Sequence, residues 1–314
     1  MAALDSYGSE ALSELYVPHF EVDEVLAVDW DGTMGIVSEN VELLKGEAAR
    51  YGVSPAQIEA SKAEAKAHDG FFDPLSDVES LLGDDQFTEF GDRFIGDGRG
   101  RATLYDDAGD LLVWAEKVTA PTVGLTHGKN PLWQFVKVRR GLEEARQKNG
   151  ANGYLYTEVM TGPKEKGPHI GDWRAPNGTF PVAGLDENGQ TIAVIHGGSV
   201  ELLDDRSYSH EGLPPAPHAT GALVKRASAP ESRRLEGIPE HLRDRVRIVW
   251  GLGDISVSPI KVPASRRRTI ALPSGIVAFK PLYAPGKYKP GLLITPQTSF
   301  SDLRAASRRQ LAHR

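Results

Sequence analysis

Short apolar runs recur along the chain, and several of them end at a polar side chain. Residues 25–28 are Val-Leu-Ala-Val, residues 121–125 are Pro-Thr-Val-Gly-Leu, and residues 199–203 are Ser-Val-Glu-Leu-Leu. Runs of this length and composition are typical of strands buried in a parallel sheet. Further strands are predicted over residues 154–159 and 246–250. Because helical patterns separate these runs, the chain is expected to form an open α/β sheet.

The stretch between the first two predicted strands is helical and strongly acidic. Residues 41–45 and 55–60 combine helix-forming side chains with a helical spacing of apolar positions. Ser54 is the expected N-cap of the second of these helices, with Pro55 at its first position. Residues 110–117 form an amphipathic helix that leads back to the sheet.

The remaining chain shows weaker patterns. Residues 180–196 read either as a hairpin, with its turn at residues 186–189, or as the start of a helix. Prolines and glycines predict loops beyond residue 206. The other expected elements are helices over 10–15, 132–148 (N-cap Asn130, then Pro131), 239–244 and 301–310 (capped by Ser301), and strands over 270–272, 276–279 and 292–294.

Composition excludes several classes of protein. The 314 residues contain no cysteine, so disulfides, thiol nucleophiles and zinc–thiolate sites are excluded. No apolar run approaches the length of a membrane span, and the N-terminal residues lack the pattern of a signal peptide. A cytoplasmic protein without a membrane partner is therefore expected.

The net charge of −7 conceals an asymmetry along the chain. Residues 1–220 carry 18 Lys and Arg against 37 Asp and Glu, whereas residues 221–314 carry 18 against 6. The basic part either packs on the acidic part or forms a surface that binds polyanions. Apolar stretches between its basic residues favour packing, because solvated tails do not carry them.

Asp29 and Asp31 are the strongest candidates for chemistry. They directly follow the first strand, and ligands of an open α/β sheet bind at the carboxyl ends of its strands. Two carboxylates at close range repel each other unless a cation lies between them or one is protonated. The alternative is an ordinary turn, in which Asp and Gly serve only as turn-forming residues. Thr126 also ends a strand and precedes a helix N-terminus, which is a natural anion site.

Residues 29–33, Asp-Trp-Asp-Gly-Thr, resemble the first motif of the haloacid dehalogenase-like hydrolases, Asp-x-Asp-Gly-Thr after an apolar strand. Thr126 resembles the second motif of that family, and Lys166-Gly167-Pro168-His169-Ile170 resembles the third. Asp204 and Asp205, at the end of an apolar run, resemble the fourth. Lys164 is an alternative to Lys166 in the third motif.

The resemblance covers about residues 21–250 and implies a doubly wound, Rossmann-like parallel-sheet core. The core would comprise residues 1–34 and 111–258, and residues 35–110 would form the helical cap seen in one class of the family. Residues 259–314 would be a small basic, β-rich C-terminal extension. Gly251-Leu252-Gly253-Asp254 is an alternative fourth motif, although no second carboxylate lies near Asp254 in the sequence.

The resemblance implies a Mg²⁺-dependent phosphomonoester hydrolase. Asp29 would be the nucleophile that forms an aspartyl-phosphate, and Asp31 the general acid and base. Mg²⁺ would be held by Asp29, by Asp204 or Asp205, and by the backbone carbonyl of Asp31. The substrate would be contacted by Thr126, His127 and Lys166.

Two other functions are kept as alternatives. One is a phosphatase for nucleotides or nucleic-acid ends that uses the basic C-terminal part. The other is a non-enzymatic scaffold that binds a partner through that part. A small-molecule phosphomonoester is the favoured partner, because the acidic body would repel nucleic acid at close range.

Overall fold

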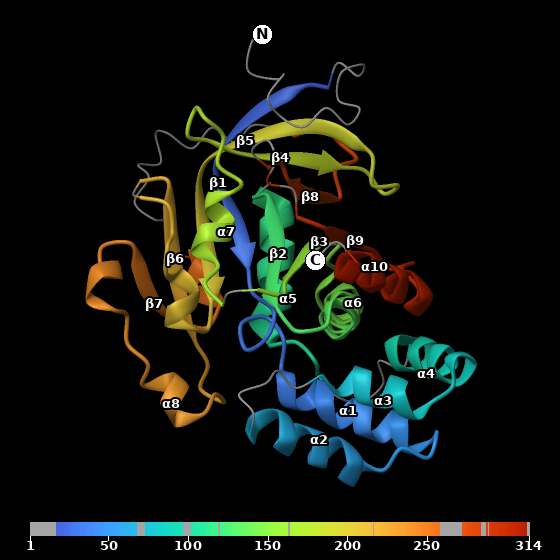
Figure 1. The fold of residues 1–314 in the computed structure, drawn as a ribbon. Helices are drawn as coiled ribbons and strands as arrows, with labels where there is room; N and C mark the ends of the chain where they lie inside the picture. The colour runs from blue at the N-terminus through green and yellow to red at the C-terminus, as the bar shows by residue number, and fades with distance from the viewer. Residues whose placement is uncertain are drawn as a thin grey trace.

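The computed structural model describes residues 17–67, 73–96, 102–118, 120–162, 164–215, 217–257, 272–283, 287 and 289–312. One sheet of nine strands runs through this part of the chain (Figure 1). Its main path, in the order β7-β6-β5-β1-β2-β3-β9, contains β7 (Val246–Trp250), β6 (Ala219–Lys225), β5 (Thr191–Asp204), β1 (His19–Val28), β2 (Thr122–His127), β3 (Leu155–Met160) and β9 (Gly291–Ile294).

Six of these strands are parallel to their neighbours. From β1 the chain adds β2 and β3 on one side, and then crosses back to add β5, β6 and β7 on the other side. The topological switch point therefore lies between β1 and β5, as in a doubly wound fold. The prediction of a doubly wound α/β core is confirmed.

The long strand β5 extends the sheet beyond the parallel core. Its first half pairs with the antiparallel strand β4 (Phe180–Leu185), which in turn pairs with β8 (Ala278–Pro281). The β4–β5 connection is a tight turn in which the Asp186 carboxylate accepts hydrogen bonds from the backbone N–H groups of Asn188 and Gln190. Of the two readings of residues 180–196, the hairpin is correct.

Alternation of side chains along the central strands divides the core in two. Leu26 and Val28 belong to a cluster on one face of the sheet, and Val25 and Ala27 to a cluster on the other. Two helices, α5 (Asp106–Val118) and α6 (Pro131–Asn149), contribute to the first cluster. Asn130 caps α6 as predicted, since its carboxamide oxygen accepts a hydrogen bond from the backbone N–H of Leu132 at 3.0 Å.

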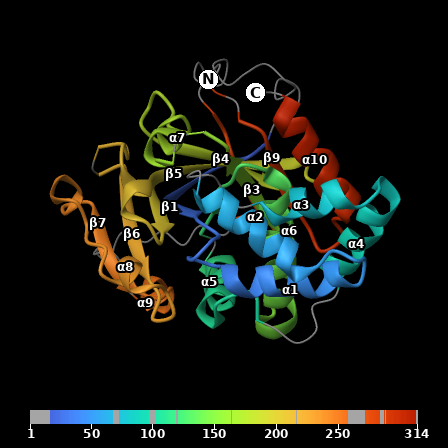
Figure 2. The same cartoon turned by 60° about the horizontal axis from the view of Figure 1, so that its bottom comes forward.

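Four helices that lie between β1 and β2 in the sequence form a layer beyond the carboxyl ends of the parallel strands (Figures 1 and 2). They are α1 (Val37–Ala49), α2 (Pro55–Ala67), α3 (Pro74–Leu81) and α4 (Asp84–Gly96). Ser54 caps α2 as predicted, through reciprocal hydrogen bonds with Gln57. This layer packs on the rest of the core through three stacked phenylalanines of α4, which are Phe87, Phe90 and Phe94.

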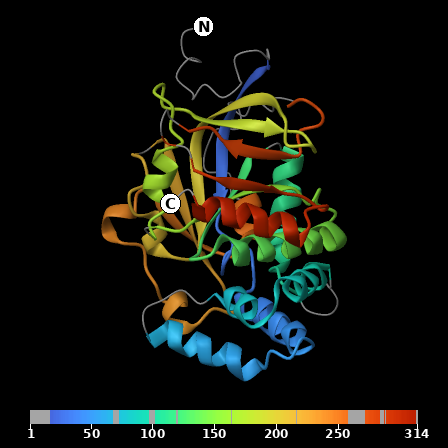
Figure 3. The same cartoon turned by 45° about the vertical axis from the view of Figure 1, so that its right-hand side comes forward.

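The C-terminal part is built into the main sheet. β8 pairs with β4, and β9 pairs with β3. The helix α10 (Phe300–Ala312) lies along α6 (Figure 3). A side chain at Gly91 of α4 would collide with Phe300, so the two helices are in close contact. The predicted cap of this helix is corrected: Ser299, not Ser301, exchanges hydrogen bonds with Asp302 across the first turn.

Two further expectations need correction. Residues 219–225 form β6, an internal parallel strand, where loops were expected beyond residue 206. Residues 239–244 contain only a short 3₁₀ turn at Glu240–Leu242. The expected helix over 10–15 and most of the expected strand over 270–272 lie outside the described residues. No helix in the described ranges has both the length and the apolar character needed to cross a bilayer.

Candidate active site

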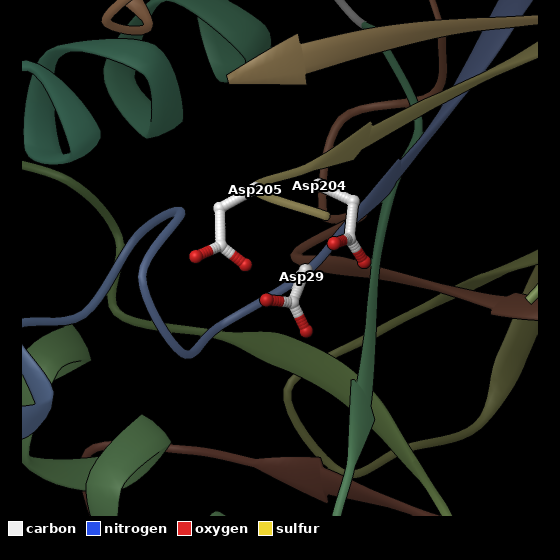
Figure 4. Close-up of side chains that lie close together, drawn as sticks. All are labelled: Asp29, Asp204 and Asp205. Carbon is white, nitrogen blue, oxygen red and sulfur yellow. The ribbon is translucent and has the colours of Figure 1, made fainter. Parts of the chain in front are cut away.

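The switch point of the sheet carries a group of buried carboxylates. Asp29 directly follows β1, and its backbone N–H donates a hydrogen bond to the Leu203 carbonyl of β5 at 2.9 Å. Asp204 is the last residue of β5, and Asp205 comes next. The three side chains point toward one another (Figure 4). Pairing of β1 with β5 therefore brings the predicted first and fourth motifs together.

These three carboxylates have the geometry of a cation site. One oxygen from each of Asp29, Asp204 and Asp205 lies within 4.8 Å of the others, and the residues are only 5%, 1% and 7% exposed. Burial, reinforced by Asp204 and Asp205 and opposed by Lys166, raises the pKa of Asp29 to about 8. Burial and Asp204 raise the pKa of Asp205 to about 6. Without a cation, these carboxylates resist ionisation together. Their hard oxygen atoms are the ligands that Mg²⁺ or a similar ion prefers, so the group fits such an ion.

Lys166 lies between two of the carboxylates. Its Nζ is 2.5 Å from Asp29 Oδ1 and 2.6 Å from Asp204 Oδ2, and its side chain is 2% exposed. Burial opposes its charge, but the two carboxylates outweigh burial and hold its pKa above the ordinary value. Of the two candidate lysines, the structure places Lys166 in the centre and Lys164 at the exposed edge of the adjoining cavity.

The backbone at Lys166 explains this placement. Lys166 immediately precedes α7 (Gly167–Gly171), and its N–H donates a hydrogen bond to the Ser209 carbonyl at 2.9 Å. A Cβ at Gly167 would lie 2.1 Å from the carbonyl oxygen of Glu211, so only glycine allows the two loops to approach this closely. The glycine after Lys166 thus fixes the loop that carries the lysine against the end of β5.

Asp31 is turned away from the three carboxylates toward α6. Both of its oxygens contact the Lys137 ammonium, and Gln134 Nε2 donates to its Oδ2 at 3.2 Å. The side chain of Asp31 is 29% exposed, whereas that of Lys137 is 1% exposed. The turn that follows Asp31 depends on Gly32, which has φ +85° and leaves no room for a Cβ beside Asp205. Trp30 is buried and packs against Gly141 of α6, which anchors this loop to the core.

The second-motif residues differ in their positions. Thr126 is 1% exposed, and its hydroxyl donates to Gln134 Oε1 at 3.3 Å; it is not among the residues that line the cavity. His127 does line the cavity, with Nε2 2.8 Å from the Gly162 carbonyl. Burial and the nearby lysines lower the pKa of His127. A role for Thr126 in direct substrate contact stays a prediction, because its hydroxyl is engaged by α6.

A cavity of about 320 Å³ opens beside the carboxylates. Val37 and Val41 of α1 line one wall, and loops at the carboxyl ends of β2, β3 and β5 line another. The structure adds several polar lining residues that the sequence did not indicate: Lys129, Gln134, Lys137, Arg206, Tyr208 and Arg233. Arg233 Nη1 is 2.8 Å from Asp205 Oδ2, so it neutralises the outermost carboxylate of the group.

The alternative fourth motif is not part of this site. Asp254 belongs to the short helix α9 (Gly253–Val257) and is exposed. Its carboxylate accepts a hydrogen bond from the backbone N–H of Trp250 at 3.3 Å. Asp254 therefore serves the local turn after β7 and lies outside the group formed by Asp29, Asp204 and Asp205.

Comparisons with known proteins find similarity among solved structures. No family model and no curated protein matches the chain. A Burkholderia xenovorans protein described as a haloacid dehalogenase-like hydrolase is 13% identical, with a TM-score of 0.46 over 76% of this chain and 99% of that one. A HAD family hydrolase from Deinococcus radiodurans, with bound phosphate and sodium, is 12% identical, with a TM-score of 0.34 over 74% and 93% of the two chains.

A Bacillus subtilis protein described as the HAD-hydrolase YfnB, bound to magnesium, is 11% identical, with a TM-score of 0.36 over 74% and 97% of the two chains. These similarities concern the arrangement of the chain. The chemistry of the site depends on this chain's own residues.

Proposed function

We propose that the protein is a Mg²⁺-dependent phosphomonoester hydrolase of the haloacid dehalogenase-like type. The observation that supports this most directly is the group of three buried carboxylates at the switch point, with Lys166 between two of them. Such a group combines a nucleophile, a cation site and a positive charge that can meet a phosphoryl oxygen. Asp31, two residues after Asp29, adds a carboxylate for proton transfer to the leaving group.

Asp29, Asp204 and Asp205 would hold the metal ion, with the backbone carbonyl of Asp31 as a further ligand. Bound there, Mg²⁺ supplies the positive charge that lets a carboxylate approach a phosphate dianion. Asp29 Oδ attacks phosphorus, and the bond from phosphorus to the ester oxygen breaks. Lys166 compensates the charge on the equatorial oxygens.

Asp31 carries the protons in both halves of the reaction. It gives a proton to the departing alcohol and later takes one from the water that attacks the phosphorus of the aspartyl-phosphate at Asp29, which releases inorganic phosphate and regenerates the carboxylate. Its contacts with Lys137 and Gln134 fix the carboxylate at the cavity wall, where it could reach the leaving group of a bound substrate. A halide leaving group needs no proton, so a carboxylate held at this place favours phosphoryl transfer over dehalogenation.

The domain assignment is part of the proposal. We regard α1 to α4 as the cap, because Val37, Val41 and Asp73 of this layer form one side of the cavity. The cap would select substrates and exclude water during the reaction. The cavity of about 320 Å³ is at the low end for small-ligand sites, which favours a small phosphomonoester over a nucleic-acid end.

The test measures the release of inorganic phosphate from a broad panel of phosphometabolites. Each substrate is assayed once with Mg²⁺, at about 5–10 mM so that a weak magnesium site is filled, and once with EDTA. Asp29→Asn should be inactive with every substrate. Asp254→Asn is the matched control, since it removes an exposed carboxylate that the competing motif would require, and it should retain activity. Activity that survives Asp29→Asn or EDTA would refute the proposal, as would halide release from haloacids in place of phosphate release.

A further inference from the structure

A buried hydrogen-bond network lies behind the loop that carries Lys166. Glu158 lies near the end of β3, His169 lies in α7, and Tyr283 follows β8. Oε2 of Glu158 is 2.7 Å from Nε2 of His169, and it accepts a hydrogen bond from the Tyr283 hydroxyl at 2.5 Å. The Tyr283 oxygen is also 3.2 Å from Nε2 of His169, so each side chain contacts the other two. We call Glu158, His169 and Tyr283 the loop clamp.

The loop clamp cannot touch a substrate in the cavity. Glu158 is 1% exposed, and His169 and Tyr283 are each 9% exposed. None of the three is among the described residues that line the cavity. Their neighbours Ile170 and Trp173 belong to the apolar cluster on the face of the sheet that also holds Val25 and Ala27. Any effect of the clamp on a reaction must therefore act through another residue.

The position of the clamp makes Lys166 that residue. Glu158 lies two residues before the end of β3, and His169 lies in the first turn of α7, three residues after Lys166. The contact between them joins the two ends of the loop that presents the lysine. On the α7 side, the backbone N–H of Ile170 donates a hydrogen bond to the Lys166 carbonyl at 3.0 Å. A shift of His169 would therefore move the backbone of Lys166.

The clamp is better suited to fixing a position than to stabilising the fold. A buried carboxylate loses its hydration, and replacing such polar groups by apolar side chains is often neutral or stabilising. Oε1 of Glu158 is buried and has no hydrogen-bond partner within the described part of the chain, so this loss is only partly offset. The three directed contacts specify one arrangement of β3, α7 and the segment after β8. A catalytic group requires such precision, because a misplacement on the order of 1 Å can cost about 10²-fold in rate.

We propose that the members of the loop clamp are positioning residues that hold Lys166 in place at the switch point. This inference rests on the proposed phosphatase function, and it concerns the placement of the lysine that compensates phosphoryl charge. It also connects the C-terminal part of the chain to the reaction, since Tyr283 belongs to that part. The backbone beside Tyr283 is itself held by the sheet, because the Leu282 N–H donates a hydrogen bond to the Pro181 carbonyl at 2.9 Å.

A double-mutant cycle of Tyr283→Phe and Lys166→Met tests this connection, with kcat and KM measured in Mg²⁺ for a phosphomonoester that the wild-type protein hydrolyses. Tyr283→Phe removes one oxygen atom and keeps the ring. It should lower kcat about tenfold, which is part of the 10²–10³ that a charge-stabilising donor supplies, and change KM by less than about twofold. In the Lys166→Met protein the same substitution should change kcat by less than about twofold, because the residue through which it acts is absent.

Thr298→Val is the matched control. Thr298 is 9% exposed and lies in the turn before α10, where its hydroxyl accepts a hydrogen bond from the Thr295 N–H at 2.8 Å. The substitution removes a buried hydroxyl from the same C-terminal part without altering the loop of Lys166. Its kcat should stay within about twofold of the wild-type value. A loss as large as that of Tyr283→Phe would attribute both effects to general destabilisation and overturn the inference.

Hydrogen exchange of the metal-free proteins tests the clamp without any reaction. The Lys166 N–H donates a hydrogen bond to the Ser209 carbonyl at 2.9 Å, and in Tyr283→Phe it should exchange about tenfold faster while the amides in the middle of α6 keep their rates. Unchanged exchange at Lys166, or a uniform rise throughout the protein, would overturn the inference. Equal losses of kcat from Tyr283→Phe with and without Lys166 would do the same. If no phosphomonoester is hydrolysed, the proposed function fails, and hydrogen exchange still decides whether the clamp holds the loop.

Discussion

Replacement of Lys166 by methionine tests the arrangement of the buried carboxylates at the switch point through protein stability. The Nζ atom lies 2.5 Å from Asp29 and 2.6 Å from Asp204, and all three side chains are at most 7% exposed. Methionine has a similar length but no charge. The variant would therefore leave two buried carboxylates facing each other, and breaking a buried ion pair in this way costs about 3–5 kcal/mol.

The expected change is large enough to measure by thermal unfolding. At about 2.1 cal/mol/K of unfolding entropy per residue, a chain of 314 residues loses about 1.5 °C in Tm for each kcal/mol. Metal-free Lys166→Met should therefore unfold about 5–8 °C below the wild-type protein. Turnover should also fall by about 10²–10³, the usual loss for one charge-stabilising donor.

Magnesium should reverse much of this loss of stability. A divalent ion between the carboxylates relieves the repulsion that the lysine relieved before, and a ligand that binds only the folded state raises its stability. We expect Mg²⁺ to raise the Tm of Lys166→Met more than it raises that of the wild-type protein. Differential scanning calorimetry in EDTA and in saturating Mg²⁺ measures both shifts.

The chain offers a matched control at Lys45 of α1. Lys45 also contacts two carboxylates, Glu42 and Glu59, but these are about half exposed. Lys45→Met should lower the Tm much less, because solvent screens the remaining charges, and its response to Mg²⁺ should match that of the wild-type protein. Equal losses in the two variants, or equal shifts with Mg²⁺, would refute the buried arrangement around Lys166.

Three further predictions concern other buried groups. Asp29→Asn should abolish turnover and raise the metal-free Tm, because burial already disfavours the ionised carboxylate; calorimetry in EDTA and a phosphate-release assay check both effects. Burial and Glu201 raise the pKa of Glu24 from 4.5 to about 8, so the folded state binds an extra proton between these values and stability falls as pH rises from about 4.5 to about 8. Glu24→Gln should flatten this slope, and urea unfolding at pH 5 and pH 8 would show no difference between variant and wild type if the idea is wrong. Tyr283→Phe, which removes the 2.5 Å hydrogen bond to Glu158 beside His169, should destabilise the protein by about 1–3 kcal/mol, and an unchanged urea midpoint would contradict it.

The main elements of the site could be predicted because each follows a strand in the sequence. An apolar run that ends in Asp29, and another that ends in Asp204, give the strand and the candidate site residue in one pattern. The order of the strands then brings the two ends together at the switch point. In the sequence Lys166 was distinguished from Lys164 only by the Pro at position 168, and the structure places Lys166 beside Asp29.

The residues missed by the sequence analysis lie on helices or beyond loops. Lys137 is buried in the middle of α6, but a lysine in a helix rich in Arg and Lys reads as a solvated charge. Arg233 reaches Asp205 from a short helix after a proline, and nothing in the local pattern indicates that contact. The strand β6 was missed because prolines and glycines precede it, and its apolar run, residues 221–224, is short.

Ser299 illustrates a signal that was available. A capping box places an acidic side chain three residues after the N-cap serine, and Asp302 stands at that spacing from Ser299. Ser301 has no such partner at position 304, which is arginine. The spacing of the acidic partner, and not the serine alone, identifies where the last helix begins.

The contacts of the C-terminal residues explain the charge asymmetry of the chain. Basic residues after position 220 pair with acidic residues before it: Arg226 with Asp107, Arg233 with Asp205, Arg247 with Glu201, and Arg304 with Glu79 and Asp84. The pairs of Arg304 accompany apolar burial, since Phe300 of α10 packs on Phe87 and Gly91 of α4 and Leu303 is buried in the same core cluster. Among the described residues the basic part thus packs on the acidic part, as the apolar stretches favoured, and much of its charge is used inside the molecule. A polyanion would have to compete with these internal carboxylates for the same cations. For this reason the small cavity at the switch point, and not the basic C-terminal part, is the better candidate for binding an anionic ligand.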